Sequence, residues 1–223
     1  MSVSNYSTSA QNYLKTIWAM QEWDQDRALQ PSALANYVGV RPSTVTDAIK
    51  KLADLGLVDH SPYSDITLTA TGRKHALEMV RRHRLIETYL VQELGYSWDE
   101  VHDEAEVLEH AVSDKIIERI DAKLGFPTKD PHGDPIPNAA GEIVIPDASP
   151  MTGADVSRDV VVERISDDDP KLLQYLAQHG VEVGSRLRFE QDSPFSETLT
   201  AATATGTITL GAAALSQIWI SRP

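Results

Sequence analysis

The order of the apolar periodicities in the first 70 residues most narrows what this chain can fold into. Helical spacing predicts a helix over about residues 8–23, a short one over 32–38 and a third that begins at Pro42. Gly39 supplies a tight turn between the second and third helices. Short apolar runs on either side of a Ser61–Asp65 turn then predict a small hairpin. Two helices, a turn, a third helix and a hairpin form the order of a winged helix-turn-helix.

The rest of the chain is helical at first and then changes to short strands. Helices are predicted over about 70–94, over 98–111, where Ser97-x-x-Glu100 reads as a capping box, and after Ser113. Residues 126–155 hold six of the twelve prolines and are typical of a loop and linker. From about residue 156, five or six short strands are expected, with one helix at 170–178. Those strands centre on Val160–Val162, Val181–Val183, Leu187–Phe189, Thr198–Thr200, Thr207–Leu210 and Ile218–Ile220.

The expected fold class is therefore mainly α with a small β part. An N-terminal winged helix-turn-helix is followed by a helical domain, a linker and a C-terminal β-barrel module. The corresponding boundaries are residues 1–73, 74–140, 141–155 and 156–223.

Composition excludes several classes of function. The chain has no cysteine, so disulfides and thiolate sites are excluded and any metal must be held by oxygen and nitrogen. No apolar run approaches the ~20 residues of a membrane span, and no signal peptide is recognisable. We therefore expect a cytoplasmic protein with no membrane partner. The net charge is −13, but residues 1–72 hold five Lys and Arg against seven Asp and Glu. Most of the negative charge therefore lies outside the predicted winged helix-turn-helix.

Glu106, Glu109 and His110 carry the spacing E-x-x-E-H. On a helix, positions i, i+3 and i+4 share one face, so two carboxylates and an imidazole would converge there. Two anions that close together repel each other, and a divalent cation relieves the repulsion. The alternative is a solvated acidic helix with incidental histidines.

A second group adjoins the first. His83 and Glu87 are four residues apart, and His102 follows on the next predicted helix. Three of the seven histidines thus fall within 28 residues that also carry acidic neighbours. Together with the predicted winged helix-turn-helix upstream, this clustering favours a divalent-metal site over a solvated acidic helix with incidental histidines.

The third helix is the candidate DNA-reading element. Val45 belongs to its apolar stripe, whereas its neighbours would project outward near the helix N-terminus, the part that meets base edges in the major groove. The candidates are Arg41, Pro42, Ser43, Thr44, Thr46 and Asp47, with Lys50 and Lys51 adding positive charge and Lys15 and Arg27 as further phosphate contacts. The alternative is a surface helix of a winged-helix module that contacts proteins.

Several segments in combination resemble a known family. They are Asn12–Ile17, the third helix through Val58, Leu68–Gly72, Arg82–Glu87, Val101–Glu106, Glu109-His110 with Ser113-Asp114, and Pro131–Pro137. Residues 5–140 resemble the diphtheria toxin repressor and manganese transport regulator family of metal-dependent repressors. The C-terminal module is similar to the SH3-like domain of the longer members.

The resemblance implies two metal sites. The primary site would be formed by Glu106, Glu109 and His110 with a first-helix residue, here Asn12 or a neighbouring oxygen of Thr8 or Ser9; the ancillary site would be His83, Glu87 and His102. In long members the β module adds a ligand to the ancillary site, and the matching stretch here is Ser166–Lys171. We take Asp168 as that ligand, although a shift by one residue would exchange it for a neighbour. The alternative for this stretch is an acidic loop.

Two departures from the family bear on the metal. Iron-sensing members carry a cysteine where this chain has Glu106, and a harder carboxylate favours Mn²⁺. Because Mn²⁺ is lowest in the Irving–Williams order, geometry and ligand number must select it. Asn12 stands where other members have Met or Asp, and its amide oxygen is a weaker, neutral ligand.

The expected function is that of a homodimeric repressor activated by two Mn²⁺ per chain, with Fe²⁺ or another divalent transition metal as the alternative cofactor. The resemblance implies a palindromic operator in double-stranded DNA that controls manganese uptake, and the apolar stripe of 113–124 is the expected dimer surface. A metallohydrolase is a competing hypothesis, but the chain has no H-E-x-x-H, and we expect no enzyme. A metal-independent winged-helix regulator that senses an organic ligand is the third hypothesis.

Overall fold

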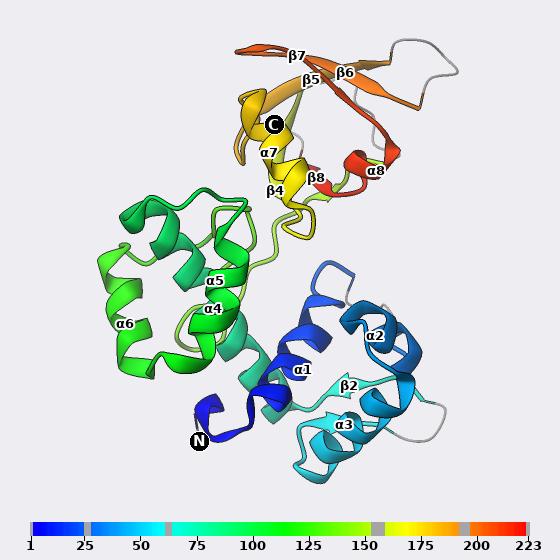
Figure 1. The fold of residues 1–223 in the computed structure, drawn as a ribbon, viewed down its shortest axis with the longest axis vertical. Helices are drawn as coiled ribbons and strands as arrows, with labels where there is room; N and C mark the ends of the chain where they lie inside the picture. The colour runs from blue at the N-terminus through cyan, green and yellow to red at the C-terminus, as the bar shows by residue number, and fades with distance from the viewer. Residues whose placement is uncertain (1, 25–27, 61–63, 153–158, 192–196, 222–223) are drawn as a thin grey trace.

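The computed structural model describes residues 2–24, 28–60, 64–152, 159–191 and 197–221. After a 3-10 turn, η1 (Val3–Asn5), its helices are α1 (Thr8–Ala19), α2 (Pro31–Val38), α3 (Pro42–Asp54), α4 (Ala70–Leu94), α5 (Val101–Ala111), α6 (Asp114–Lys123), α7 (Pro170–Gln178) and α8 (Ala212–Leu215). Its strands are β1 (Val58–Asp59), β2 (Thr67–Leu68), β3 (Ser149–Pro150), β4 (Asp159–Ile165), β5 (Arg186–Gln191), β6 (Leu199–Thr203), β7 (Gly206–Leu210) and β8 (Ile218–Ser221). Figure 1 shows three groups: α1–α3 with β1 and β2, the helices around α5 and α6, and the C-terminal sheet.

The N-terminal group has the predicted winged helix-turn-helix order. Ser7 caps α1 by accepting from the amide of Ala10, and Gly39 ends α2 in the left-handed conformation, with φ +72°. Strands β1 and β2 pair antiparallel as the hairpin. Gly72 is required where α4 begins, since a Cβ there would lie 1.8 Å from the carbonyl oxygen of Leu57. The start of α4 is therefore packed directly against the backbone that leads into the hairpin.

Helix α4 connects the first two groups, as its colour change from cyan to green shows (Figure 1). Its N-terminal half packs on α1, and its later residues Leu85, Ile86 and Leu90 form a second core with α5 and α6. The helix buries charged residues that are paired. Arg84, for example, donates to Glu22 Oε2 at 2.6 Å and to the Pro135 carbonyl at 2.6 Å. These pairs fix α4 against both neighbouring segments.

The C-terminal domain is an antiparallel sheet in the order β3-β8-β4-β5-β6-β7, with α7 packed against it. The expected closed barrel is wrong, because β3 and β7 are the two edges of this order and do not pair with each other within the described residues. Two further expectations differ. Ser149 and Pro150, which we assigned to the linker, form β3 against β8, and 181–183 is not a strand. Gly180, at φ +68°, turns the chain after α7, and the Val181 amide donates to the Leu176 carbonyl.

Helix boundaries were predicted to within one residue for α2, α4 and α7 and for the start of α3 at Pro42, and less well for α1 and α5. Helix α1 ends at Ala19, short of residue 23. Helix α5 begins at Val101, three residues later than expected, because only half of the predicted capping box forms: Glu100 accepts from the Ser97 amide, and no side chain caps the helix. Ser113 caps α6 as predicted.

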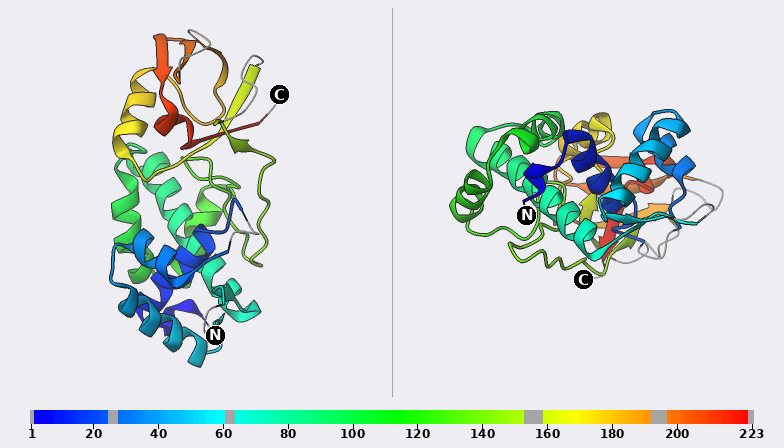
Figure 2. Two further views of the ribbon diagram at one scale, coloured as in Figure 1. Left: turned by 90° about the vertical axis from the view of Figure 1, so that its right-hand side faces the viewer. Right: turned by 90° about the horizontal axis from the view of Figure 1, so that it is seen from below.

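The C-terminal domain contacts the N-terminal group through an aromatic junction. The Arg164 guanidinium lies 4.2 Å from the ring centroid of Trp219 and 5.3 Å from that of Trp23, and its Nε donates to Asp134 at 2.6 Å. Trp23 follows α1, and Trp219 is in β8. Figure 2 shows the sheet at one end of the molecule, next to the helical part rather than separated from it.

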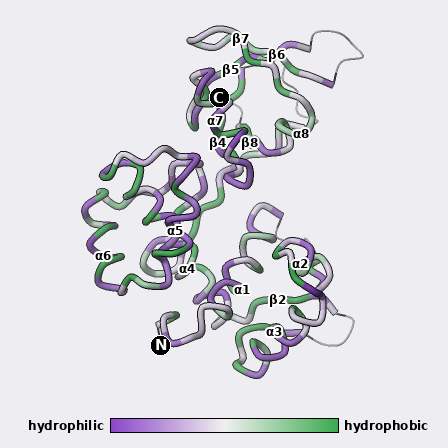
Figure 3. Tube along the Cα trace, in the orientation of Figure 1, coloured by the Kyte–Doolittle hydropathy of each residue, from purple (hydrophilic) through white to green (hydrophobic). Residues whose placement is uncertain are grey.

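Apolar and polar residues are interspersed along the helices, as Figure 3 shows. Among the described residues, no helix is both long enough and apolar enough to cross a membrane.

Candidate metal centre and DNA-reading helix

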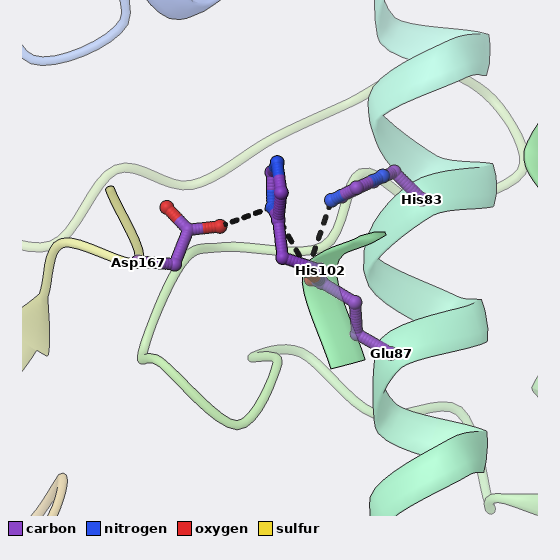
Figure 4. A group of neighbouring side chains, drawn as sticks. All are labelled: His83, Glu87, His102 and Asp167. Atoms are coloured by element: carbon purple, nitrogen blue, oxygen red, sulfur yellow. Dashed lines mark hydrogen bonds and ion pairs between the residues drawn. The ribbon is translucent and has the colours of Figure 1, made fainter. Parts of the chain in front are cut away.

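Four predicted or neighbouring ligand residues meet where the three groups join. His83 and Glu87 lie one turn apart on α4, with Nε2 of His83 2.9 Å from Oε1 of Glu87. His102 extends from α5, and its Nδ1 lies 3.6 Å from the same Glu87 oxygen. Asp167, in the loop between β4 and α7, completes the group, with Oδ2 2.7 Å from His102 Nδ1 (Figure 4). The four offer ligand atoms within 4.8 Å of one another. We call them the His83 cluster.

The structure brings Asp167 to this cluster, in place of the predicted Asp168. Asp168 Oδ2 instead accepts from the Ser166 hydroxyl at 2.8 Å. The loop is held by its backbone, because the amide of the buried Ser166 donates to the Gln217 carbonyl. That anchor sets which aspartate faces His102.

Electrostatics in the His83 cluster favour charged side chains. Burial acts to lower the pKa of His83, but the Glu87 and Glu109 carboxylates together outweigh it and raise that pKa to about 9. Hydrogen bonds to Asp167 and Glu87 raise the pKa of His102 to about 11. Burial opposes ionisation of Glu87 and Asp167, yet the imidazolium partners lower the pKa of Glu87 to about 2 and hold that of Asp167 well below its usual range. Without metal, the cluster is held together by these ion pairs.

A second group shares Glu87 and was not predicted. Asp130 and His132 lie in the loop after α6, and their ligand atoms fall within 4.8 Å of each other and of Glu87, all three being buried. The His132 ring stacks on Trp98 and its Nε2 lies 2.6 Å from the Trp98 carbonyl oxygen, which leaves Nδ1 facing Glu87 Oε2 at 4.0 Å. We call these three the His132 cluster. The signal was present in the Pro131–Pro137 segment of the family resemblance, but His132 was not among the predicted ligands.

The predicted primary set is only partly brought together. Glu106 and Glu109 lie one turn apart on the same face of α5, and the cation that pairs with both is the ammonium of Lys15, on α1. His110 stays beside Glu109, with Nε2 3.4 Å from Glu109 Oε1, while its Nδ1 lies 2.6 Å from Gln11 Oε1. Lys15 is therefore not the solvent-exposed phosphate contact that the sequence suggested, since its side chain is only 14% exposed.

An unpartnered polar atom marks where a cation fits. His132 Nδ1 is buried and makes no hydrogen bond to any described residue, and the nearest carboxylate oxygen, Glu87 Oε2, lies 4.0 Å away. Atoms that converge without hydrogen-bond alignment are typical of a ligand set. With two imidazoles and two carboxylates, the His83 cluster has the hard and borderline donors that suit a divalent cation.

The recognition helix α3 presents its predicted residues to solvent. Val45, Ile49 and Leu52 are buried in the core of the N-terminal group. The predicted contacts that are exposed are Arg41, Pro42, Ser43, Thr44, Thr46, Asp47, Lys50 and Lys51. The Thr46 hydroxyl donates to the Pro42 carbonyl at 3.0 Å, so it is partly used within the helix. Arg27, the remaining predicted contact, lies outside the described residues.

Three family models together match nearly the whole chain. The N-terminal DNA binding domain of iron dependent repressors matches residues 5–66, their metal binding and dimerisation domain matches 69–138, and the FeoA domain matches 150–222. The iron-dependent repressor IdeR of Mycobacterium leprae is 30% identical over 194 residues, which are 80% of this chain and 82% of that protein. The diphtheria toxin repressor of Corynebacterium glutamicum is 30% identical over 188 residues, 78% of this chain and 80% of that protein.

Solved structures agree with this assignment. A manganese-dependent transcriptional repressor in complex with manganese is 51% identical, with a TM-score of 0.88, over 96% of this chain and all of that chain. Another manganese-dependent transcriptional repressor is 46% identical, with a TM-score of 0.77, over 95% of this chain and 98% of that one.

The fold and the site define a metal-dependent, DNA-binding transcriptional repressor. The chain belongs to the family of the diphtheria toxin repressor and IdeR, in the long form that carries a C-terminal FeoA domain.

Proposed function

We propose that this protein is a homodimeric, manganese-activated repressor of manganese-uptake genes. The observation that carries the proposal is the His83 cluster, in which α4, α5 and the loop of the C-terminal domain at Asp167 contribute two imidazoles and two carboxylates to one half-buried group. This donor set contains no thiolate, so it favours a hard or borderline ion over a soft one. The two similar structures named for their manganese dependence support the choice of metal.

The metal centre would consist of the His83 and His132 clusters, which share Glu87. Each Glu87 oxygen faces a different cluster, since Oε1 lies 2.9 Å from His83 Nε2 and Oε2 lies 4.0 Å from His132 Nδ1. Glu87 would therefore help to hold a cation in either cluster. A bound ion would add to the positive charge that Glu87 and Asp167 obtain from histidines and that Asp130 obtains from Arg84, whose Nε lies 3.7 Å from Asp130 Oδ2. The predicted set Asn12, Glu106, Glu109 and His110 stays a prediction here.

The centre can couple metal to DNA because its ligands come from different domains. His83 and Glu87 lie on α4, which begins at the wing, and Asp167 belongs to the C-terminal domain. A metal ion that binds one arrangement of these domains more tightly than another shifts the protein toward that arrangement. In a homodimer this would set the separation of the two α3 helices near one turn of DNA, or ~34 Å, and a palindromic operator follows from the dimer's twofold symmetry.

The dimer surface would lie on the helical domain. Ile116, on α6, is 47% exposed, and Val107, on α5, is 70% exposed. These apolar side chains lie in the segment that the metal binding and dimerisation model matches. Burying them against a second copy would remove apolar surface from water.

Binding of an operator-containing promoter fragment tests the proposal. Fluorescence anisotropy would be recorded with chelator, Mn²⁺, anaerobic Fe²⁺ and Zn²⁺ in parallel, for the wild type, Glu87→Ala and the exposed control Glu182→Gln. We expect Mn²⁺ to tighten DNA binding by about 5–150-fold in the wild type and the control. Glu87→Ala should lose most of this gain.

The ion ranking separates the alternatives within this experiment. A stronger response to Fe²⁺ than to Mn²⁺ would make the protein an iron-responsive repressor of the same family. Equal DNA affinity in chelator and in every metal would contradict metal activation and favour a regulator that senses an organic ligand. Repression does not require catalysis, and we assign no enzymatic role to the metal centre.

A further inference from the structure

Asp134 joins three parts of the molecule through one carboxylate oxygen. Its Oδ1 accepts from the indole Nε1 of Trp23 at 3.3 Å and from Nε of Arg164 at 2.6 Å, and it lies 3.5 Å from a terminal nitrogen of Arg84. Trp23 follows α1 of the DNA-binding domain, Arg164 belongs to β4 of the C-terminal domain, and Arg84 belongs to α4. Asp134 is only 5% exposed. The contact between the first and last domains therefore depends on a shielded acceptor that the helical domain supplies.

The loop that carries Asp134 is held in place by its own backbone. The Asp134 amide donates to Asp130 Oδ1 at 2.9 Å, and the Asp130 amide donates to the Asp134 carbonyl at 3.0 Å. Gly133, at φ +91°, lies directly against β4, since a Cβ there would be 2.0 Å from the Glu163 carbonyl oxygen. Asp134 is therefore held as an acceptor for donors from both neighbouring domains.

Arg164 connects the same carboxylate to the proposed metal centre. It is the cross-strand partner of Trp219 on β8, and its guanidinium lies 4.2 Å from the centroid of that indole ring. Asp167, the ligand proposed from the C-terminal domain, follows Arg164 by three residues. An ion that holds Asp167 would therefore also hold Arg164 against Asp134.

We propose that Trp23 is a positioning residue that couples the C-terminal domain to the DNA-binding domain. The inference rests on the proposed function, in which metal fixes the C-terminal domain at Asp167. The indole N–H bonds to Asp134, and the ring lies beside Arg164 and Trp219, so both contacts need the two domains in place together. The position of one domain then favours that of the other, and this preference is a coupling free energy between metal and DNA. Loss of the N–H should weaken the effect of metal on DNA binding rather than DNA binding itself.

The test compares the DNA affinity of each variant in chelator with its affinity at saturating Mn²⁺, by fluorescence anisotropy with an operator-containing promoter fragment. Trp23→Phe keeps an aromatic ring and removes the donor to Asp134. Trp18→Phe is the matched control, because that indole lies on α1 of the same domain and its N–H has no hydrogen-bond partner among the described residues. We expect Mn²⁺ to improve the DNA affinity of the wild type and of Trp18→Phe by the same factor. For Trp23→Phe the factor should be smaller by about threefold to tenfold, which is the net contribution of a typical hydrogen bond, with the affinity in chelator unchanged.

Asp134→Asn, alone and combined with Trp23→Phe, assigns the effect to this contact. Because the indole acts through Asp134, the double variant should show the same factor as Asp134→Asn alone. The contact is also observable without metal or DNA, in the NMR spectrum of protein with isotope-labelled tryptophan. There, Asp134→Asn should shift the indole N–H signal that is missing from Trp23→Phe.

Three results would overturn the proposal. One is a Trp23→Phe protein with the wild-type factor or, if that variant does not fold, an Asp134→Asn protein with the wild-type factor. The second is an equal loss of DNA affinity in chelator and in Mn²⁺, which would give Trp23 a role only in the packing of its own domain. The third is a Trp23 indole signal that Asp134→Asn leaves unmoved. A wild type without any gain from Mn²⁺ would overturn the proposed function as well, whereas a normal wild-type gain that Trp23→Phe retains would overturn this inference alone.

Discussion

Nδ1 of His102 lies 2.7 Å from Oδ2 of Asp167, although 65 positions separate the two residues in the sequence. His102 belongs to the helical domain and Asp167 to the loop that leads out of the first long strand of the C-terminal domain. The contact therefore joins the C-terminal domain to the residues proposed to bind metal. It also explains how a domain distant from DNA can influence the metal centre.

Replacing Asp167 should weaken metal binding, whereas replacing Asp168 should not. Loss of an outer-sphere partner typically costs 10–100-fold in metal affinity, so Asp167→Asn, which neutralises a proposed ligand, should cost at least about tenfold. Asp168→Asn is a matched control, because its side chain contacts Ser166 rather than His102. Isothermal titration with Mn²⁺ measures both. Equal losses in the two variants would contradict the distinction between them, and a loss in Asp168→Asn alone would return the ligand assignment to Asp168.

Metal affinity should rise with pH. Both His83, with a pKa of about 9, and His102, with a pKa of about 11, carry protons at neutral pH and must release them to bind metal. Each released proton steepens the dependence by up to about tenfold per pH unit. Titrations between pH 6.5 and 8.5, in buffers of different ionisation enthalpy, report the number released. His102→Gln should reduce that number by one, and an affinity that is flat over this range would contradict the assignment.

The metal-free protein should show the opposite trend in stability. The pKa of His83 is raised above its unfolded value of 6.5, so its contribution is fully present below about pH 6.5 and is lost as the pH rises toward 9. The contribution of His102 is smaller, since its side chain is 44% exposed and screened. Asp130 acts in the same direction, because burial and Asp134 raise its pKa to about 8 and its ionisation then opposes folding. Melting in chelator should therefore occur at lower temperature at pH 8.5 than at pH 6.5, and a higher melting temperature at pH 8.5 would contradict this.

Sequence periodicity identified the candidate site residues that lie on helices and missed those that lie in loops. The spacing of His83 and Glu87 on one helix face was sufficient to group them, because 3.6 residues per turn fixes their relation. Asp167 and Asp168 could not be separated, since the anchor that turns one of them toward His102 is a backbone bond to Gln217. Asp130 was missed for the same reason.

Lys15 illustrates a second limit. A lysine near a DNA-binding motif fits a phosphate contact as well as an internal ion pair, and only the packing of α1 against α5 decides between them. The prediction of a closed β-barrel was wrong for a similar reason. Short alternating strands predict a sheet, but they do not determine whether its edges meet.

The aromatic junction should contribute to metal affinity from a distance. Arg164→Met would remove the ion pair with Asp134 and the contacts with Trp23 and Trp219. A cation–π contact contributes about 0.5–2 kcal/mol, so the C-terminal domain should dock less firmly and Mn²⁺ affinity should fall about threefold to tenfold. Arg188→Met is the control, since that arginine pairs with Asp159 at an exposed position. Unchanged Mn²⁺ affinity in Arg164→Met would show that Asp167 is held in place without this junction.

The two lysines of α3 should contact the DNA phosphates, whereas the hydroxyl of Thr44 should contact the bases. Lys50→Ala and Lys51→Ala should each weaken DNA binding equally for operator and unrelated sequence, and lower the salt slope by about 1 per protomer. Thr44→Ala should cost about 1–3 kcal/mol at the operator and relax the preference at one base pair. Anisotropy titrations at saturating Mn²⁺ and several salt concentrations separate the two effects, with Lys171→Ala, an exposed lysine of α7, as the control. An unchanged salt slope in both lysine variants would mean that α3 does not approach the DNA backbone through this face, and would favour the hypothesis that the helix contacts protein.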